Sequence, residues 1–204
     1  MKNTSSRTGQ RIILPQRALI VLCGPAGAGK STFAHTFVEQ HKHQGYRTTS
    51  IVSSDYCRAL LCDDETNQQV NRDTFDLFYY LINKRMFYGR LTIADSTALQ
   101  KEARQRLLEL AARHHYSTCL FVFNMTLETC MQYDQHQMRG RIVGEKVIVY
   151  HLGLLQQALE AIPQEGWQQV HMLDEHHPFP DIIVSPQTNT NSAHNAPHST
   201  QPAP

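Results

Sequence analysis

The residues from Gly24 to Ser31 have the types and the spacing that bind a phosphate chain. Their sequence, GPAGAGKS, fits the pattern G-x-x-x-x-G-K-[ST] at every fixed position. Glycines let the backbone curl so that successive N–H groups point inward and form an anion nest. The Lys30 ammonium reaches the β- and γ-phosphates of a nucleoside triphosphate, and the Ser31 hydroxyl is a hard oxygen ligand for Mg²⁺. The pattern predicts an ATP site with Mg²⁺, formed by Gly24, Pro25, Ala26, Gly27, Ala28, Gly29, Lys30, Ser31 and Thr32.

Two aspartates follow other apolar runs. Asp55 comes after the β-branched run 48–52, with Arg58 one turn later, and Asp95 follows the run 91–94. An ionised aspartate can orient an acceptor hydroxyl and take its proton during phosphoryl transfer. Asp55 is therefore a candidate base or, alternatively, a helix N-cap, and Arg58 is a candidate ligand for an acceptor phosphate or, alternatively, a surface arginine. Asp95 ends a Walker-B-like run and is expected to hold Mg²⁺ through water, or to cap a helix.

A polar stretch between Gln135 and Val143 contains Arg139 and Arg141, with glycines beside them. A mobile segment of this kind is suited to close over a triphosphate and to bring a positive charge to the transferring phosphate. We therefore count Arg139 and Arg141 among the candidate catalytic residues. The alternative is a solvated basic loop.

The elements that must position these residues alternate along the chain. Strands are predicted at 18–23, 48–52, 91–94, 117–123 and 169–173, and helices at 30–44, 73–88, 100–115, 127–137 and 145–161. Such alternation predicts an α/β fold, and together with the phosphate-binding motif at Gly24 to Ser31 it indicates the P-loop kinase type. This fold is a three-layer sandwich with a mostly parallel five-stranded sheet, helices on both faces and an arginine-bearing lid. Ligands of such sheets bind at the carboxyl ends of the strands, where the candidate residues stand.

Composition limits the remaining possibilities. Residues 1–10 are polar and expected to be flexible, residues 11–184 form the kinase domain, and residues 185–204 read as a disordered polar tail. No apolar run is long enough to span a membrane. An odd count of five cysteines without a CxxC pair predicts reduced thiols and a cytoplasmic protein. The net charge of +1 means that a nucleic-acid partner would be held by a local patch.

Several segments together resemble the 5′-hydroxyl polynucleotide kinases, the kinase module of nucleic-acid end-healing enzymes. The matching segments are GPAGAGKSTFA, SSDYCR, LCDDETNQQ, GRLTIADST followed by Arg104, RGRIV with VIVYH downstream, and EGWQQVHML. The resemblance spans roughly residues 18–173. The P-loop is shared with a very large superfamily, whereas the SSDxxR, CDDExNQ and DST segments are much more specific.

The resemblance implies an ATP- and Mg²⁺-dependent kinase that phosphorylates the 5′-OH end of RNA or DNA. It implies that Lys30 and Ser31 bind the phosphates and Mg²⁺, that Asp55 is the general base, and that Arg58 contacts the phosphate of the terminal nucleotide. It also implies a lid arginine on the transferring phosphoryl group. Lids of this family usually carry several arginines, whereas this segment has two. We expect no phosphatase or ligase domain beside the kinase module.

Two other functions compete with this expectation. The same fold can phosphorylate a small-molecule alcohol or a nucleoside, which the near-neutral charge and the arginine-poor lid favour. The second is a nucleotide-binding switch or partner-binding protein that itself has little transfer activity. The oligomeric state is left open.

Overall fold

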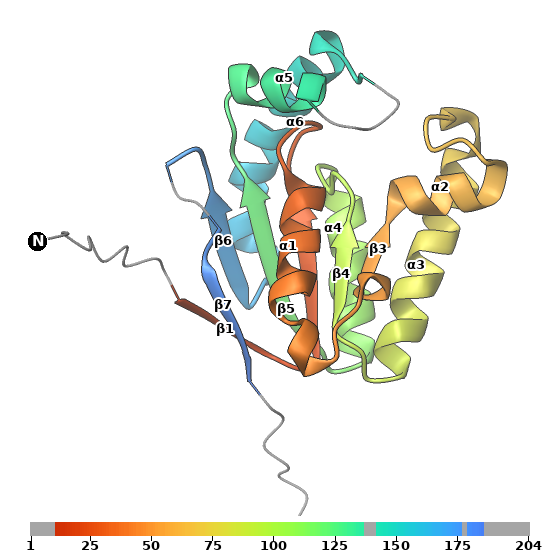
Figure 1. The fold of residues 1–204 in the computed structure, drawn as a ribbon, viewed down its shortest axis with the longest axis vertical. Coiled ribbons are helices and arrows are strands. Elements are labelled where there is room, and N and C mark those ends of the chain that lie inside the picture. Colours follow the sequence, from red (N-terminus) through yellow and green to blue (C-terminus); the bar gives the residue numbers. More distant parts are fainter. Residues whose placement is uncertain (1–10, 137–141, 177–178, 186–204) are drawn as a thin grey trace, which may run out of the picture.

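Five parallel strands form the central sheet of the protein (Figure 1). A computed structural model describes residues 11–136, 142–176 and 179–185 of the 204-residue chain. The strand order is β3-β4-β2-β5-β6. The strands are β2 (Ala18–Cys23), β3 (Ile51–Ser53), β4 (Thr92–Asp95), β5 (Ser117–Phe123) and β6 (Gln169–Leu173). The predicted α/β fold with a parallel five-stranded sheet is confirmed.

Alternate residues of β2 face opposite sides of the sheet, and each set belongs to a different apolar core. Leu19 and Val21 pack with helices α3 (Asn71–Phe87) and α4 (Lys101–Arg113) and with the second half of α6 (Glu145–Ala161). Ile20 and Leu22 pack with α1 (Lys30–Gln40) and with α5 (Leu127–His136). All six residues of β2 are buried because helices cover both faces.

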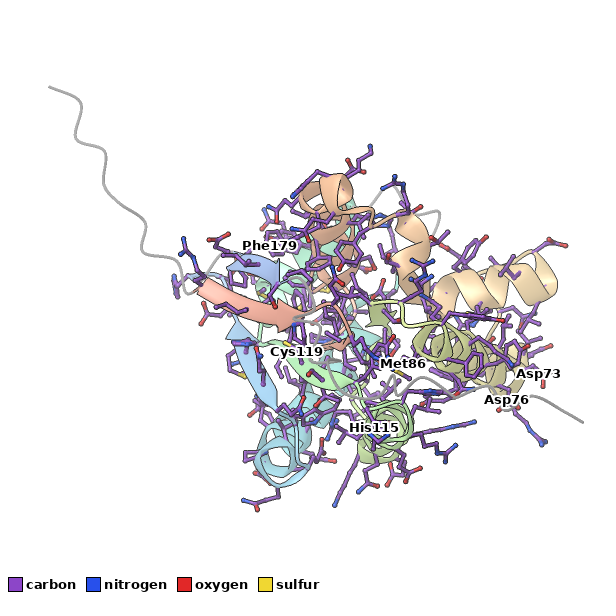
Figure 2. All side chains as sticks on the ribbon, turned by 90° about the horizontal axis from the view of Figure 1, so that it is seen from below. Asp73, Asp76, Met86, His115, Cys119 and Phe179 are labelled. Carbon is purple, nitrogen blue, oxygen red and sulfur yellow. The ribbon has the colours of Figure 1, made fainter. Side chains whose placement is uncertain are left out.

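Figure 2 views this arrangement along the sheet with the side chains drawn. Met86 of α3 and Cys119 of β5 are buried inside the fold, at 0% and 2% exposure. Asp73 and Asp76 lie on the outer surface of α3. The amphipathic pattern of α3 thus separates a core-facing stripe from a solvated one.

Two further strands form a small parallel ribbon that the sequence analysis did not predict. β1 (Arg11–Pro15) pairs with β7 (Asp181–Ser185) in register, from Arg11 opposite Asp181 to Pro15 opposite Ser185. Both strands alternate between exposed and buried residues. Their buried side chains pack in the same apolar core as Phe33 and Phe37 of α1. These side chains are Ile12, Leu14, Ile182 and Val184.

Some predicted boundaries differ from the structure. The predicted strand 48–52 is a 3-10 turn at Thr48–Ser50 followed by the three-residue strand β3, and the predicted helix 30–44 ends at Gln40. Helix α2 (Ser54–Cys62) follows β3 directly. The predicted flexible residues 1–10 and residues 186–204 of the predicted tail lie outside the described residues. Ser185, predicted to begin the tail, is instead the last residue of β7, because it pairs with Pro15. No helix in the described part of the chain is both long and apolar enough to cross a membrane.

Candidate active site

The carboxyl ends of three neighbouring strands bring the candidate residues to one edge of the sheet. Leu22 of β2 is in register with Asp95 of β4, and Asp95 is in register with Ser53 of β3. Neighbouring strands lie about 4.8 Å apart, so these positions form a short row across the edge. The P-loop follows β2 and helix α2 follows β3. Figure 1 shows α2 and α5 at this same end of the sheet.

The P-loop has the backbone conformation that its glycines predict. Gly29 has a φ of 84° and is the N-cap of α1, which begins at Lys30. Gly27 has a φ of 75°, and a Cβ at this position would lie 2.3 Å from the carbonyl oxygen of Cys130 in α5. Larger residues are therefore excluded there by both the backbone angle and the close packing. The N–H of Gly24 donates to the carbonyl of Thr97 at 2.9 Å, which joins the loop to the segment after β4.

Lys30 lies inside the curve of the P-loop. Its Nζ donates to the carbonyl oxygens of Gly24 at 3.0 Å and Pro25 at 2.5 Å, and the residue is 9% exposed. Ser31 and Thr32 follow in the first turn of α1. The predicted ATP-binding residues therefore form one continuous loop and helix N-terminus, an arrangement that favours anions.

Asp55 lies in the first turn of α2. The N-cap of this helix is Ser53, whose side chain accepts from the N–H of Tyr56 at 3.4 Å, so the capping alternative for Asp55 is wrong. Asp55 instead accepts a hydrogen bond from Nη1 of Arg58 at 2.8 Å. The Asp55 side chain is 44% exposed and that of Arg58 is 5% exposed. The carboxylate of this pair is therefore accessible to solvent, whereas its guanidinium is buried.

Arg58 is bound on several sides, so the surface-arginine alternative is wrong as well. Besides Asp55, it donates to the carbonyl oxygen of Glu65 at 3.0 Å and to Oδ1 of Asn71 at 3.2 Å. Its Nε is buried with no hydrogen-bond partner among the described residues. These bonds fix the guanidinium plane and, through it, the position of the Asp55 carboxylate.

Asp95 is buried, at 5% exposure, where β4 ends next to the P-loop strand. Helix α4 begins several residues later with Gln100 as its N-cap, so Asp95 does not cap it. Ser31 and Asp95 supply a hydroxyl and a carboxylate, the hard oxygen donors that Mg²⁺ uses together with phosphates and water. No cluster of three or more His, Cys, Asp or Glu that could hold a metal ion occurs in the described ranges.

The two candidate lid residues, Arg139 and Arg141, lie outside the described residues. The residues that flank this segment are held together by Asp134 of α5. Its carboxylate, 3% exposed as a residue, accepts from the N–H groups of Val143 at 3.1 Å and Gly144 at 3.0 Å. Gly144 is the N-cap of α6, so Asp134 fixes the start of α6 beside the end of α5.

A buried ion pair, which the sequence analysis did not identify, supports the P-loop from behind. Arg104 and Glu165 have side chains that are each 1% exposed, and Nη2 lies 2.6 Å from Oε1. Arg104 also donates to the carbonyls of Ala98 at 2.9 Å and Leu99 at 2.8 Å. Burial, the largest influence on Glu165, would raise its pKa, but the hydrogen bonds from Arg104 and Trp167 and the charge of Arg104 lower it overall.

His151 of α6 is a second residue that the sequence analysis left without a role. Its Nδ1 accepts a hydrogen bond from the N–H of Ala26 in the P-loop at 3.2 Å. Burial lowers the pKa of His151, and the charge of Lys30 lowers it further. In the sequence, His151 was marked only as the last residue of the VIVYH segment. That position does not show that its ring contacts the P-loop.

Comparisons with known proteins agree with this architecture. The AAA_33 family model, described as an AAA domain, matches residues 19–162. The comparison with curated proteins found no significant match.

Three solved structures share the fold at low sequence identity. A chain of the Pnkp1/Rnl/Hen1 RNA repair complex has a TM-score of 0.59 and 18% identity over 77% of this chain and 48% of its own, so this chain spans about half its length. A putative kinase from Chloroflexus aurantiacus has a TM-score of 0.53 and 12% identity over 78% and 88%. The APS kinase CysC of Mycobacterium tuberculosis has a TM-score of 0.50 and 15% identity over 87% and 91%. All three are similar to this chain in having the P-loop kinase fold.

Proposed function

Because the chain belongs to the AAA_33 family of AAA domains, we propose that it is an ATP-dependent phosphotransferase that acts on the 5′-hydroxyl end of a polynucleotide. One observation carries this proposal. A half-exposed carboxylate, Asp55, is fixed by a buried arginine at the sheet edge that also carries the P-loop. A phosphate-donor site and an acceptor-side base therefore lie at one edge of one sheet.

On the donor side, the P-loop backbone and the N-terminus of α1 bind the phosphates of ATP. Lys30 exchanges its bonds to the carbonyls of Gly24 and Pro25 for bonds to the anionic β- and γ-phosphate oxygens. Arg139 or Arg141 adds a positive charge at the transferring phosphate. These groups stabilise the charge that builds up in the transition state.

On the acceptor side, Asp55 accepts the proton of the 5′-hydroxyl as its oxygen attacks the γ-phosphorus. The bond between the γ-phosphorus and the bridging oxygen breaks, ADP leaves, and the product is a 5′-phosphate. Arg58 holds Asp55 in position during this step through the 2.8 Å bond. Contact between Arg58 and a phosphate of the terminal nucleotide is part of the proposal.

We propose Ser31 and Asp95 as the residues that would hold Mg²⁺, Asp95 through water, because Ser31 is an oxygen donor of the P-loop and Asp95 is one at the end of the neighbouring strand. The ion neutralises charge on the β- and γ-phosphates when it is bound. The residues of the P-loop orient the bound nucleotide.

The polynucleotide acceptor is supported by the segments SSDYCR and LCDDETNQQ and by the similarity in fold to a chain of an RNA repair complex. The alternative is a small-molecule alcohol or nucleoside acceptor. A net charge of +1 favours this alternative, since phosphate backbones are held chiefly by lysine and arginine. The fold is also shared, over most of both chains, with a kinase bound to the small molecule APS.

Transfer from γ-labelled ATP tests the proposal. The full chain, with Mg²⁺, is offered RNA and DNA oligonucleotides that carry a 5′-OH, the same oligonucleotides with a 5′-phosphate, and a panel of nucleosides and small alcohols. We expect label on the 5′-OH oligonucleotides alone, with a KM that rises steeply with salt. The variant Lys30→Ala should reduce the transfer at least about 100-fold. Label on a small alcohol with no label on any oligonucleotide would establish the alternative instead.

A further inference from the structure

The imidazole of His151 is held in a single tautomer by the P-loop. Its Nδ1 accepts the Ala26 N–H at 3.2 Å, although the two residues are 125 positions apart in the chain. A ring nitrogen that accepts a hydrogen bond carries no proton, so the proton of the neutral imidazole is on Nε2. Burial and the charge of Lys30 both lower the pKa of His151 and so favour this neutral form.

The Nε2–H of this ring is an unused donor. Among the described residues it has no hydrogen-bond acceptor in the protein. The ring is half-buried, and its other nitrogen is fixed on a loop whose amides and lysine are suited to bind anions. A donor with a fixed direction at the rim of an anion site has a phosphate oxygen as its natural acceptor.

A hydrogen bond of Lys30 indicates which phosphates His151 lies near. Its Nζ donates at 2.5 Å to the carbonyl oxygen of Pro25, and the N–H of the same peptide group, on Ala26, donates to His151. Lys30 is the P-loop residue that reaches the β- and γ-phosphates, and its charge acts on His151. Ala26 is on the limb of the loop that leaves β2, whereas α1 starts at the opposite limb with Lys30. The ring therefore lies near the terminal end of the phosphate chain.

We propose that His151 is a nucleotide-binding residue that donates Nε2–H to a terminal phosphate oxygen of a bound nucleoside triphosphate. Ala26 acts as the group that sets its tautomer and direction. This inference rests on the proposed function only for nucleotide binding at the P-loop, and it holds for any acceptor. Its consequence is that His151 distinguishes ATP from ADP.

Two substitutions separate this role from that of a simple bond between α6 and the P-loop. His151→Asn keeps an acceptor oxygen near the position of Nδ1 but has no group at the position of Nε2. His151→Gln places its amide N–H₂ near Nε2 but has no acceptor near Nδ1. A purely structural bond would survive in His151→Asn, whereas the phosphate donor would survive in His151→Gln.

The experiment measures the affinity of the full chain for the ATP analogue AMPPNP and for ADP by calorimetry, both with Mg²⁺ and without any acceptor. We expect the ratio of the two affinities to fall about tenfold in His151→Asn and to change less than about threefold in His151→Gln. His171→Asn is the matched control. His171 is also a half-buried histidine whose pKa is lowered by burial, but it stacks on Phe121 at 5.3 Å, away from the P-loop.

An unchanged ratio in His151→Asn, or an equal gain or loss for both nucleotides in each variant, would overturn the inference. If neither variant folds, nitrogen NMR of the wild-type histidines decides instead. The ring is identified by its contact with the Ala26 amide proton, and its Nε2–H signal should move to the hydrogen-bonded range with AMPPNP and not with ADP. A failure of 5′-OH labelling leaves these results untouched, so the two proposals are overturned separately.

Discussion

Two arginine–carboxylate pairs lie near the candidate site, and they are built differently. In the Arg104–Glu165 pair both side chains are 1% exposed, and the carboxylate receives bonds from Nε and Nη2 of Arg104 and from Trp167. In the Arg58–Asp55 pair the arginine is also buried, at 5% exposure, but the carboxylate is 44% exposed and receives one bond from it. The first pair is enclosed by protein, whereas the second exposes its carboxylate to solvent.

If Asp55 is the proposed base, the exposure of its carboxylate, and not the ion pair itself, distinguishes it from Glu165. The Arg104–Glu165 pair is closed, and Arg104 also binds the carbonyls of Ala98 and Leu99. These residues directly follow Thr97, whose carbonyl binds Gly24. The Arg58 pair retains a buried Nε without a partner among the described residues, which lowers stability and is typical of functional sites. We therefore expect the Arg104–Glu165 pair to contribute mainly to stability and the Arg58–Asp55 pair mainly to activity.

The largest effect is expected from Asp55→Asn. The amide keeps the shape and can accept the bond from Arg58, but it cannot take a proton from the acceptor. We expect kcat/KM for labelled transfer to fall about 10²- to 10⁴-fold, with a melting temperature close to that of the wild type. Asp76→Asn, an exposed aspartate of α3, is the control and should retain full activity. Substantial activity in Asp55→Asn would remove the distinction between the pairs.

Glu165→Ala should have the next largest effect, and it should act on stability. It leaves the guanidinium of Arg104 buried without its carboxylate, which costs about 3 to 5 kcal/mol of unfolding free energy. Urea denaturation measures the loss. The double variant Arg104→Met, Glu165→Met should recover most of it, because apolar residues then replace both charges. A loss below about 1 kcal/mol would mean that the closed pair is not a structural anchor.

Arg58→Lys is expected to have a smaller effect that falls mainly on activity. An ammonium cannot hold Asp55, the Glu65 carbonyl and Asn71 together, because it lacks the planar fork of the guanidinium. We expect kcat to fall about tenfold, which corresponds to about 1.4 kcal/mol. Arg106→Lys on α4, whose side chain is half-exposed, is the matched control. Equal rates in the wild type and Arg58→Lys would show that Arg58 does not position Asp55.

The smallest effect concerns pH. The folded-state pKa of Glu165 is below its ordinary value of 4.5, so the unfolded chain binds more protons at this position as the pH falls below 4.5. The contribution of Glu165 to stability is therefore complete above pH 4.5 and is lost as the pH falls through its folded-state pKa. We expect the stability gap between wild type and Glu165→Gln to be constant from pH 7 to about pH 5 and to shrink below that. A gap that is constant to pH 3 would contradict the lowered pKa.

The sequence predicted the parts of the molecule that depend on local pattern. The strands 18–23, 117–123 and 169–173 have the predicted bounds, because uniform apolar or alternating runs between turns are read directly from the chain. Asp55 and Asp95 were predicted to lie at one edge of the sheet because each follows a strand, and β3 and β4 are indeed parallel neighbours.

The missed parts depend on contacts between distant residues. Arg104 and Glu165 are 61 positions apart, and His151 and Ala26 are 125 apart, so no local pattern joins them. The direction of the His151 ring depends on how α6 is rotated against the sheet, which packing decides. Strands β1 and β7 are short, and apolar and polar residues do not alternate clearly in their sequences. Among the described strands, each pairs only with the other, so neither could be identified by itself.

The β1–β7 ribbon has a consequence for the order in which the chain folds. Arg11 and Asp181 are 170 positions apart, so their pairing closes a very long loop and is expected late, after the five-stranded sheet. Without β7, Phe33 of α1 can already pack on Phe121 and Phe123 of β5, but Ile12 and Leu14 of β1 have no partner strand. The pairing with β7 thus determines when the apolar side chains of β1 are protected from aggregation.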